Sequence, residues 1–322
     1  MIFLAFAQEA TSQRFYYLGT VGEYAVQLEL TLNGDEVTGS YYYTSIGTPI
    51  ELRGKQTGDL TETGQPYTVG ELDENGNAVA TFEGELSSTG LESGNTFIGT
   101  WTGDNDVMLP FNLERVAEFA EIFLRQGRIE STATYPVFSG DLAVFNTAID
   151  QTKQVEDTLQ FFEEGQGYQT KGELYNGWTL ILDHEIKYAS EEFVSILVPI
   201  YTYTGGAHGN TGFDALNFLH EENSVRQLEL RDIFTESADL KSVINTVTGE
   251  LEVQQASFIV DRSVTLTEQD LSIFTLSPKG VTFHFAPYQV ASYAEGMFEV
   301  TVPFEGLRNS LQPEIIAEFL NN

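Results

Sequence analysis

The stretch Tyr201-Thr-Tyr-Thr-Gly-Gly-Ala-His-Gly-Asn210 decides how the second half of this 322-residue chain is interpreted. An alternating segment from Ser195 to Tyr203 predicts a strand that runs directly into it. Three glycines then surround His208, one of only four histidines in the chain. Glycine at this density indicates backbone conformations or close approaches that a Cβ would forbid. The stretch therefore predicts a strand followed by a tight turn that carries one histidine.

The region around this turn mixes helical and extended patterns. Apolar residues recur every three or four positions from Leu142 to Phe162, which predicts a helix ended by Gly165 and Gly167. Further helices are predicted at 240–251 and 311–320, and strands at 177–188, 193–203, 213–219, 274–285 (a hairpin around residues 277–280) and 298–302. The second half is therefore predicted to be α+β, with an antiparallel sheet and two to three helices.

The first part of the chain reads as all-β. Alternating segments are predicted as strands at 24–30, 37–43, 50–57, 66–72, 78–86, 96–102 and 107–113, and Asn33-Gly34-Asp35 predicts a hairpin turn. Turn residues recur without any helical period between them, which is typical of an antiparallel meander, sandwich or small barrel. Gly39 and Gly99 each stand two residues before a large aromatic (Tyr41, Trp101), a device that bends barrel strands.

These patterns divide the chain into residues 1–14, an antiparallel β domain at 15–115 and an α+β domain at 116–322. Residues 1–14 are interpreted as the remnant of a signal peptide or a disordered N-terminus, because Ala5-Phe6-Ala7 ends a short apolar run in a cleavage-like pattern. A truncated signal peptide implies export, to the periplasm or the medium. At the junction, Glu114 to Leu124 is expected to form a helix.

Charge and cysteine content narrow the classes of partner. The formal net charge is −33, with 4 basic and 17 acidic residues up to Arg115 and 11 and 31 after it. Such a field repels nucleic acid and would attract a basic partner at low salt, but solubility or a salty medium is the simpler explanation. There are no cysteines, so neither a disulfide nor a cysteine-ligated metal is expected. No apolar run is long enough to span a bilayer.

Several motifs of the second half come in the order of a known family. They are Thr134-Tyr-Pro-Val-Phe-Ser-Gly140, Tyr203-Thr-Gly-Gly-Ala-His-Gly-Asn210, Leu228 to Phe234, Gly280-Val-Thr-Phe-His-Phe-Ala-Pro-Tyr-Gln-Val-Ala-Ser-Tyr-Ala-Glu-Gly296 and Val302-Pro-Phe304. Together they resemble the extracytoplasmic domain of the anti-sigma factor RsiV and the N-terminal region of PdaC-type peptidoglycan deacetylases, over about residues 130–320. The resemblance implies an exported, non-enzymatic envelope module, which in RsiV binds lysozyme. Within these 322 residues we expect neither the transmembrane segment of RsiV nor a polysaccharide deacetylase domain.

His208 is the obvious candidate for catalysis or metal binding, but its sequence context lacks partners. The other histidines do not fall at ligand spacing to it, and no catalytic or phosphate-binding motif is present. We therefore expect no catalytic residues, no metal and no cofactor, and interpret His208 as a buried or half-buried hydrogen-bonding group on a structural turn. Asp232, which precedes a helix, is expected either to cap it or to link to a neighbouring strand.

Two sets of residues follow from this interpretation. Candidate ligand-binding residues are His208, Tyr203, Asn210, Tyr288 and Tyr293, and structural glycines are Gly205, Gly206, Gly209, Gly280 and Gly296. The acidic pairs Glu163-Glu164, Glu191-Glu192 and Glu221-Glu222 either meet a basic protein or are solvated faces.

The expected function is a non-catalytic binding module of the bacterial envelope. Its partner would be a basic protein such as lysozyme, or peptidoglycan, and nucleic acid is not expected. The alternative is an enzyme acting on cell-wall glycan with His208 as acid or base. A third possibility is a structural role in which the β domain is an assembly module.

Overall fold

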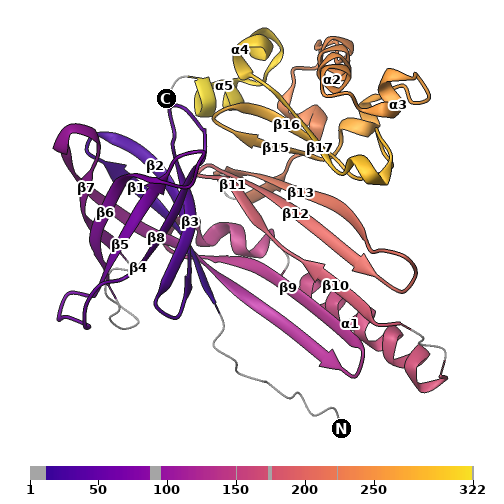
Figure 1. Cartoon of the computed structure of the whole chain (residues 1–322). Coiled ribbons are helices and arrows are strands. Elements are labelled where there is room, and N and C mark those ends of the chain that lie inside the picture. The colour runs from indigo at the N-terminus through magenta and orange to yellow at the C-terminus, as the bar shows by residue number, and fades with distance from the viewer. Residues whose placement is uncertain (1–11, 88–95, 150, 173–175, 223, 321–322) are drawn as a thin grey trace. The chain divides into compact units, whose positions relative to one another are not determined.

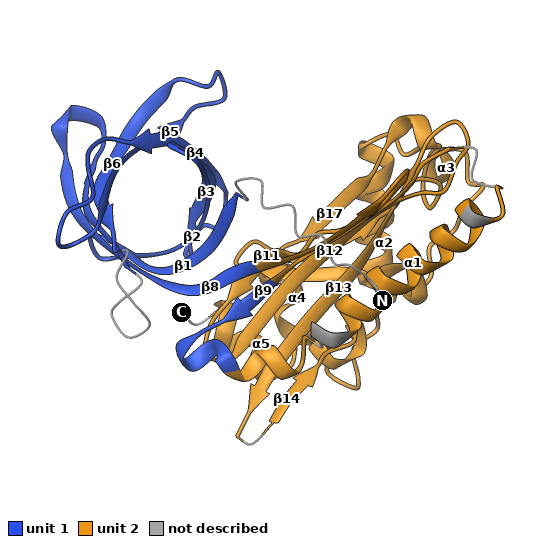
Figure 2. Ribbon diagram, turned by 90° about the horizontal axis from the view of Figure 1, so that it is seen from below, with its two compact units in different colours: residues 1–119, 136–143 blue, residues 120–135, 144–322 orange. Residues whose placement is uncertain are grey.

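The computed structural model describes residues 12–87, 96–149, 151–172, 176–222 and 224–320, so the Ala5-Phe6-Ala7 pattern lies outside the described residues. The chain divides into two compact units, residues 1–119 with 136–143 and residues 120–135 with 144–322 (Figures 1 and 2). In the described part of the chain, no helix is long and apolar enough to cross a membrane.

The first unit is a closed antiparallel β-barrel, which Figure 2 shows end-on as a ring of strands. Its strands are β1 (Gln13–Val21), β2 (Tyr24–Asn33), β3 (Glu36–Tyr43), β4 (Ile50–Gln56), β5 (Gln65–Leu72), β6 (Ala78–Leu86), β7 (Thr96–Thr102) and β8 (Met108–Gln126). Each strand pairs antiparallel with the next, and β1 pairs with β8 to close the ring. This confirms the prediction of an antiparallel all-β domain, and among the meander, sandwich and barrel that the sequence left open it is a barrel.

Large aromatic side chains fill the barrel. Tyr41, Phe82, Phe97 and Phe111 are fully buried, and Phe111 meets Phe82 and Phe97 edge-on at centroid distances of 5.1 and 4.7 Å. Alternate residues of every strand point inward, which is why the sequence shows period two. Gly39 and Gly99 lie where a Cβ would fall 2.0 Å from a backbone oxygen of the neighbouring strand, so these strands approach too closely for any side chain.

The expected helix over Glu114 to Leu124 is wrong, because β8 extends through it as one 19-residue strand. Its first part pairs with β1, from Phe111 opposite Val21 to Glu118 opposite Phe15. The segment is rich in good helix formers, but this pairing closes the barrel and overrides local propensity. β8 and β9 (Ile129–Phe138) each contribute residues to both units.

The second unit is α+β, as predicted. Its large sheet contains β9, β10 (Trp178–Leu182), β11 (Glu185–Ala189), β12 (Phe193–Tyr203), β13 (Asn210–Glu221) and β14 (Ser224–Gln227). These strands pair antiparallel except β9 and β10, which run parallel. A separate antiparallel sheet contains β15 (Phe274–Ser277), β16 (Gly280–Phe285) and β17 (Phe298–Val302), and confirms the predicted hairpin.

Helical elements contact both sheets of the second unit, the large one at β10 and the small one at β17. They are η2 (Gly140–Thr147), α1 (Gln151–Thr170), η3 (Leu230–Ile233), α2 (Lys241–Val253), α3 (Ser257–Val260), η4 (Glu268–Leu271), η5 (Tyr293–Glu295), α4 (Phe304–Leu307), η6 (Arg308–Ser310) and α5 (Pro313–Leu320), and η1 (Asp104–Asp106) lies in the barrel. Val243, Val247 and Leu251 of α2 are buried in a core shared with Phe283 and Val300 of the small sheet. The apolar stripe read from the sequence is therefore the buried face of α2.

The first predicted helix differs from the structure at both ends. Residues 140–147 form the separate 3-10 helix η2, and α1 continues past Gly165 and Gly167 to Thr170. Gly165 lies inside the helix and packs against β9. A Cβ on Gly165 would lie 3.0 Å from the Ile129 side chain, so this position favours glycine for close packing and not for ending the helix. Glycine inside a helix costs stability, but here it allows close contact with β9.

A buried polar cluster joins the small sheet to the large one. Ser195 of β12 donates to Asn217 Oδ1 of β13 at 2.7 Å, and Asn217 Nδ2 donates to the Phe274 carbonyl at 2.8 Å. The amide of Leu276 then donates to Ser195 Oγ at 2.9 Å. Ser195 and Asn217 are fully buried, so the cluster satisfies polar groups on the edge of β15 that would otherwise be costly to bury.

Candidate functional site

The glycine-rich turn joins β12 to β13, where Thr202 pairs with Asn210. Gly205 and Gly206 have φ values of 105° and 109°, a region that residues with side chains rarely occupy. A Cβ on Gly209 would lie 2.4 Å from the ring of Tyr201, and the Tyr203 hydroxyl donates to the Gly206 carbonyl at 3.1 Å. The turn therefore needs its glycines for its shape, as the sequence predicts.

His208 lies in the middle of this turn and is exposed. The prediction of a buried or half-buried histidine is wrong: its small neighbours Ala207 and Gly209 do not enclose the ring, and contact with Tyr293 still leaves His208 exposed. His208 Nδ1 donates to the Gly209 carbonyl at 2.7 Å. The ring stacks on Tyr293, with a centroid distance of 3.8 Å and an interplanar angle of 23°.

Two tyrosines from a distant segment complete an aromatic cluster on this turn. Tyr293 donates from its hydroxyl to the Gly209 carbonyl at 3.0 Å, although 84 residues separate the two in sequence. Its ring lies 5.6 Å from that of Tyr288 at an interplanar angle of 32°. We call His208, Tyr293 and Tyr288 the aromatic stack. Tyr288 is 55% exposed, so the stack ends in an aromatic ring that faces solvent.

The segment that carries these tyrosines is fixed by its own hydrogen bonds. Glu295 accepts from the Ser292 amide at 3.0 Å and from the Ser292 hydroxyl at 2.6 Å, which forms a capping box around η5. The hydroxyl of Ser257 in α3 also donates to Glu295 at 2.7 Å. These hydrogen bonds, those from Ser292 first, lower the pKa of Glu295 to about 2. The aromatic stack is thus built on a rigid support.

The structure brings three of the five predicted ligand-binding residues into contact. His208, Tyr288 and Tyr293 form the aromatic stack. Tyr203 instead closes the turn through its hydrogen bond to Gly206, and Asn210 is exposed at the first position of β13. Gly280 and Gly296 have φ values of 139° and 85°, which agrees with their predicted structural role.

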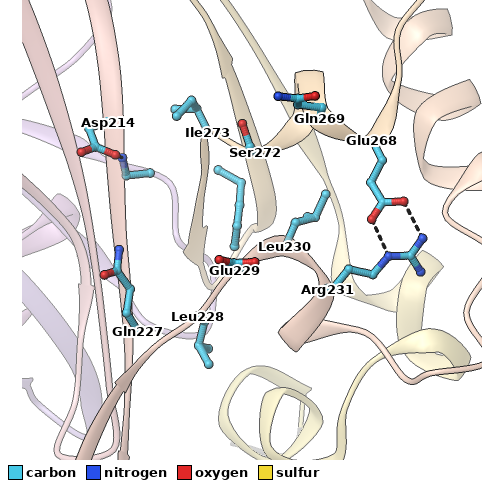
Figure 3. Close-up of a pocket in the computed structure, with 12 residues that line it drawn as sticks. Asp214, Gln227, Leu228, Glu229, Leu230, Arg231, Glu268, Gln269, Ser272 and Ile273 are labelled. Atoms are coloured by element: carbon cyan, nitrogen blue, oxygen red, sulfur yellow. Dashed lines mark hydrogen bonds and ion pairs between the residues drawn. The ribbon is translucent and has the colours of Figure 1, made fainter.

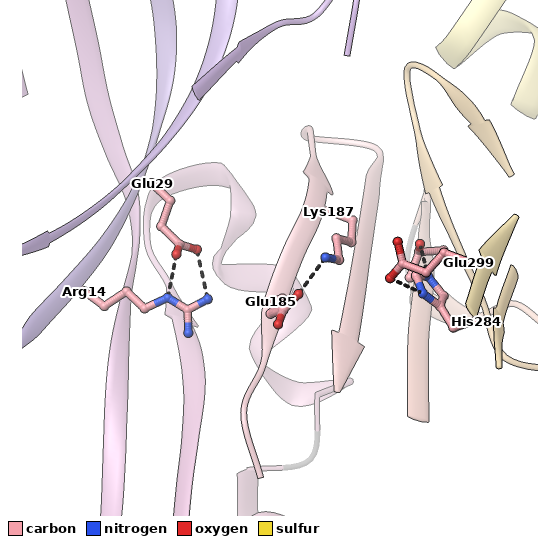
Figure 4. Close-up of polar contacts among 7 residues, drawn as sticks. Arg14, Glu29, Glu185, Lys187, His284 and Glu299 are labelled. Atoms are coloured by element: carbon pink, nitrogen blue, oxygen red, sulfur yellow. Dashed lines mark hydrogen bonds and ion pairs between the residues drawn. The ribbon is translucent and has the colours of Figure 1, made fainter. Parts of the chain in front are cut away.

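The other histidines lie apart from this turn. His284 is buried on β16, with Nε2 2.8 Å from Thr275 Oγ1 and Nδ1 3.0 Å from Glu299 Oε1, as Figure 4 shows for the Glu299 pair. The hydrogen bond from His284 holds the pKa of Glu299 below its usual range. Hydroxyl, imidazole and carboxylate follow the order of a catalytic triad. However, Thr275 is only 2% exposed, so a substrate does not reach its hydroxyl and the arrangement serves the sheet.

Sequence reasoning missed this set because it depends on strand register. Glu299 lies directly opposite His284 in the β16–β17 pair, and Thr275 lies opposite Thr282, two residues away from His284 on the same face. His184 is also buried, with Nδ1 2.6 Å from the Thr134 carbonyl, and His220 Nδ1 lies 3.2 Å from the Glu191 carbonyl. In the described part of the chain, no three histidine or acidic side chains form a group suited to hold a metal ion.

A polar pocket of about 620 Å³ lies elsewhere in the second unit (Figure 3). Arg231 and Glu268 form a bidentate ion pair on its wall, where Asp214, Gln227, Glu229, Gln269 and Ser272 also lie. Asp232 lies inside η3 and accepts from the Glu229 amide at 2.8 Å, so it does not cap the helix that follows, and its carboxylate lies 3.3 Å from Arg226 of the neighbouring strand β14. A second pocket of about 420 Å³ lies between α2 and the segment 262–266. His208 lines neither of these two pockets.

Comparisons with known proteins identify two matched regions in the second half of the chain. Residues 126–211 match the family model described as deacetylase PdaC, and residues 231–305 match DUF3298, a protein family of unknown function. These two successive matches confirm the predicted resemblance to the PdaC-type family.

Among individual proteins, the chain is similar to the peptidoglycan-N-acetylmuramic acid deacetylase PdaC of Bacillus subtilis (strain 168), with 24% identity over 196 residues. The match covers 58% of this chain and only 40% of that relative. Two crystal structures of DUF3298 family proteins are also similar. The protein from Pseudomonas aeruginosa PAO1 has a TM-score of 0.47, 18% identity, and coverage of 62% of this chain and 94% of its own. That from Bacteroides fragilis NCTC 9343 has a TM-score of 0.42, 20% identity, and coverage of 64% and 98%.

Proposed function

We propose that the second unit is a non-catalytic module that binds cell-wall glycan, in a protein exported to the bacterial envelope. The observation that carries this proposal is the aromatic stack of His208, Tyr293 and Tyr288, which is exposed and rigidly supported. The match to a deacetylase named for its action on peptidoglycan supports the same class of ligand and an extracytoplasmic location.

The physical basis is the complementarity between sugar rings and aromatic faces. A pyranose presents an apolar face of C–H groups with partial positive charge, and the face of an aromatic ring is negative. Rings that are already ordered lose little conformational entropy when a ligand stacks on them. An exposed tyrosine at the end of a fixed stack is therefore a suitable surface for a sugar.

The backbone of Tyr288 gives independent support. Its φ is 72°, a left-handed conformation that costs a tyrosine about 1 kcal/mol or more relative to glycine. Burial of the side chain does not offset this cost, since the ring is 55% exposed. A strained backbone that holds an aromatic ring in solvent fits a binding role better than a packing role.

The enzyme alternative has weaker support from the site. A general base needs a partner that orients it and a substrate within reach. In the described part of the chain, the contacts of the His208 ring are the Gly209 carbonyl and Tyr293, and neither is a carboxylate. We therefore propose binding without catalysis at this turn.

A basic protein is the second candidate partner, and one observation favours it. The acidic pairs Glu191-Glu192 and Glu221-Glu222 are exposed and come together, since His220 contacts the carbonyls of Glu191 and Glu192 at 3.2 and 2.8 Å. Four neighbouring carboxylates would attract a cationic surface. If a basic protein is the partner, calorimetric titration with hen lysozyme should show binding that weakens as the salt concentration is raised. A folded sample that gives no heat at low ionic strength would exclude it.

The glycan proposal is tested by co-sedimentation with purified insoluble peptidoglycan. We expect the wild-type protein to sediment with the polymer, and Tyr288→Ala and Tyr293→Ala to bind about tenfold more weakly or less. Tyr168→Ala is the matched control, because Tyr168 is a 46% exposed tyrosine on α1, outside the stack. Equal sedimentation of all four proteins, or none for the wild type, would exclude the proposed site.

A further inference from the structure

A buried carboxylate lies at one end of the barrel. Glu71 is the inward-facing residue near the end of β5 and is only 6% exposed. Tyr43 and Trp101 pack against the barrel core at the same end of β3 and β7, and the exposed Tyr24 at the start of β2 contacts Tyr43. This end of the barrel therefore combines a carboxylate with several aromatic rings.

The hydrogen bonds to Glu71 leave one of its oxygens free. The Tyr41 hydroxyl donates to Oε1 at 2.5 Å, and Trp101 Nε1 donates to the same oxygen. Burial, and then the hydrogen bond to Glu71, raises the pKa of Tyr41 far above its ordinary value, so Tyr41 keeps its proton and remains a donor. Among the described residues, Oε2 receives no hydrogen bond.

This pattern is unusual for a buried acid. A carboxylate offers about four acceptor positions, and buried carboxylates are ordinarily paired with a cation. In the described part of the chain, Glu71 has no basic partner, only a neutral phenol and a neutral indole. A ligand that carries a positive charge and an N–H group would supply what is missing.

The aromatic rings around Glu71 suit such a ligand. Tyr43 meets Tyr41 at a centroid distance of 5.4 Å and Tyr24 at 6.1 Å, both edge-on, and Tyr24 is 52% exposed. The Trp101 ring packs on Gly103, where a Cβ would fall 2.1 Å from it. Faces of tyrosine and tryptophan attract ammonium groups, more strongly when the cation is partly desolvated.

The loops at this end add a favourable field. They comprise residues 22–23, 44–49, 73–77 and 103–107, all of them described. They carry five acidic residues and no lysine or arginine: Glu23, Asp73, Glu74, Asp104 and Asp106. Clustered charges of one sign raise the local concentration of the opposite ion.

We propose that this end of the barrel binds a primary ammonium group, which donates an N–H to Glu71 Oε2 and lies against Trp101 and Tyr43. The inference concerns the first unit and does not rest on the function proposed for the second. Two sources present this chemistry, the side chain of lysine in a peptide and the free amine of an amino sugar, and the test separates them.

Tryptophan fluorescence provides the test, because Trp101 lies in the proposed site. The chain has two tryptophans, so the Trp178→Phe protein reports Trp101 alone. It is titrated at neutral pH with Nα-acetyl-lysine methylamide and with glucosamine, and with N-acetylglucosamine as the neutral match of the second probe. We expect a saturable change with at least one of the two amines and none with the neutral sugar. Which amine binds identifies the source.

Two variants in the same background test the role of Glu71. Glu71→Gln keeps the size of the side chain and removes its charge, and we expect it to weaken amine binding by about tenfold or more. Glu83→Gln, an exposed position on β6, makes the same charge change outside the barrel and should bind as before. If Glu71→Gln does not fold, Tyr24→Ala removes an exposed ring from the site and should weaken binding as well. The proposal would be overturned if neither amine showed saturable binding. It would also be overturned if N-acetylglucosamine bound as well as the amines, or if Glu71→Gln bound the amine with unchanged affinity.

Discussion

Tyr288 combines a left-handed backbone with a largely exposed ring, and the two properties are separated by substitution. Tyr288→Gly relaxes the backbone and removes the ring, so we expect the free energy of unfolding to stay equal or to rise, while glycan binding is lost. Tyr288→Phe keeps the ring and should keep binding. Urea denaturation and peptidoglycan co-sedimentation measure the two effects. A glycine variant that binds as well as the wild type would show that the ring has no role.

The lowered pKa of Glu295 predicts how the stability of the segment that carries Tyr288 and Tyr293 depends on pH. Its pKa is about 2 in the folded protein and near 4.5 ordinarily, so its hydrogen bonds stabilise the folded state fully above 4.5. This contribution is lost as pH falls from 4.5 through 2. We expect Glu295→Gln to melt below the wild type at pH 7 and the difference to shrink towards pH 2, as measured by thermal unfolding at each pH. If the difference in melting temperature between the wild type and Glu295→Gln grew as the pH was lowered, this prediction would be contradicted.

At the level of single residues, the sequence identifies the members of the stack but not their contacts. The glycines around His208 mark the turn, and Tyr288 and Tyr293 stand out within a run of small residues. Exposure of His208 and its stacking on Tyr293 depend on a fold that joins two segments far apart in the chain. Local pattern does not contain that information.

The three-stranded sheet depends on a glycine at the start of β16. Gly280 has a φ of 139°, and a Cβ there would lie 2.2 Å from the Val302 carbonyl oxygen of β17. We expect Gly280→Ala to destabilise the protein by about 2 kcal/mol or more, measured by urea denaturation. Gly249→Ala in α2 is the control, since a Cβ there meets nothing within 4 Å. That change should stabilise by about 0.5–1 kcal/mol. Equal effects of the two changes would refute this explanation.

The buried hydrogen bonds of Ser195 and Asn217, which join the two sheets of the second unit, give a further prediction. Asn217→Ala leaves Ser195 and the Phe274 carbonyl without their buried partner. We expect a loss of about 2–3 kcal/mol of stability. In a double-mutant cycle, adding Ser195→Ala should cost clearly less than it does in the wild type, because both changes disrupt one cluster. Strict additivity would contradict the coupling.

Elements that alternate cleanly were predicted well, and elements that depend on distant pairing were not. Seven barrel strands, the β15–β16 hairpin and α2 follow their hydrophobic periods. Residues 114–124 have helical potential, but β8 pairs with β1 as far as Glu118 and also pairs with β9, and these pairings decide the outcome. Likewise, the hydrogen bonds to Glu71 come from two other strands, through Tyr41 and Trp101. The spacing of these residues in the sequence does not indicate that both contact one carboxylate.

For the whole molecule, both halves of the chain are acidic, but the two proposed sites use charge differently. In the barrel, clustered carboxylates and a buried acid favour a cation. In the second unit, the aromatic stack relies on ring faces, so its binding to a neutral glycan should change little with ionic strength. Parallel titrations at low and high salt distinguish the two modes. Glycan binding that collapses in high salt would point to the acidic surface instead of the stack.

The most direct test of the proposed function is calorimetric titration of the wild type and Tyr288→Gly with soluble peptidoglycan fragments at neutral pH. Stacking of the glycan on His208, Tyr293 and Tyr288 predicts saturable binding by the wild type and at least about a tenfold loss in the glycine variant, with unfolding stability unchanged or higher. Wild-type protein that shows no saturable binding, or a glycine variant that binds with the same affinity, would contradict it.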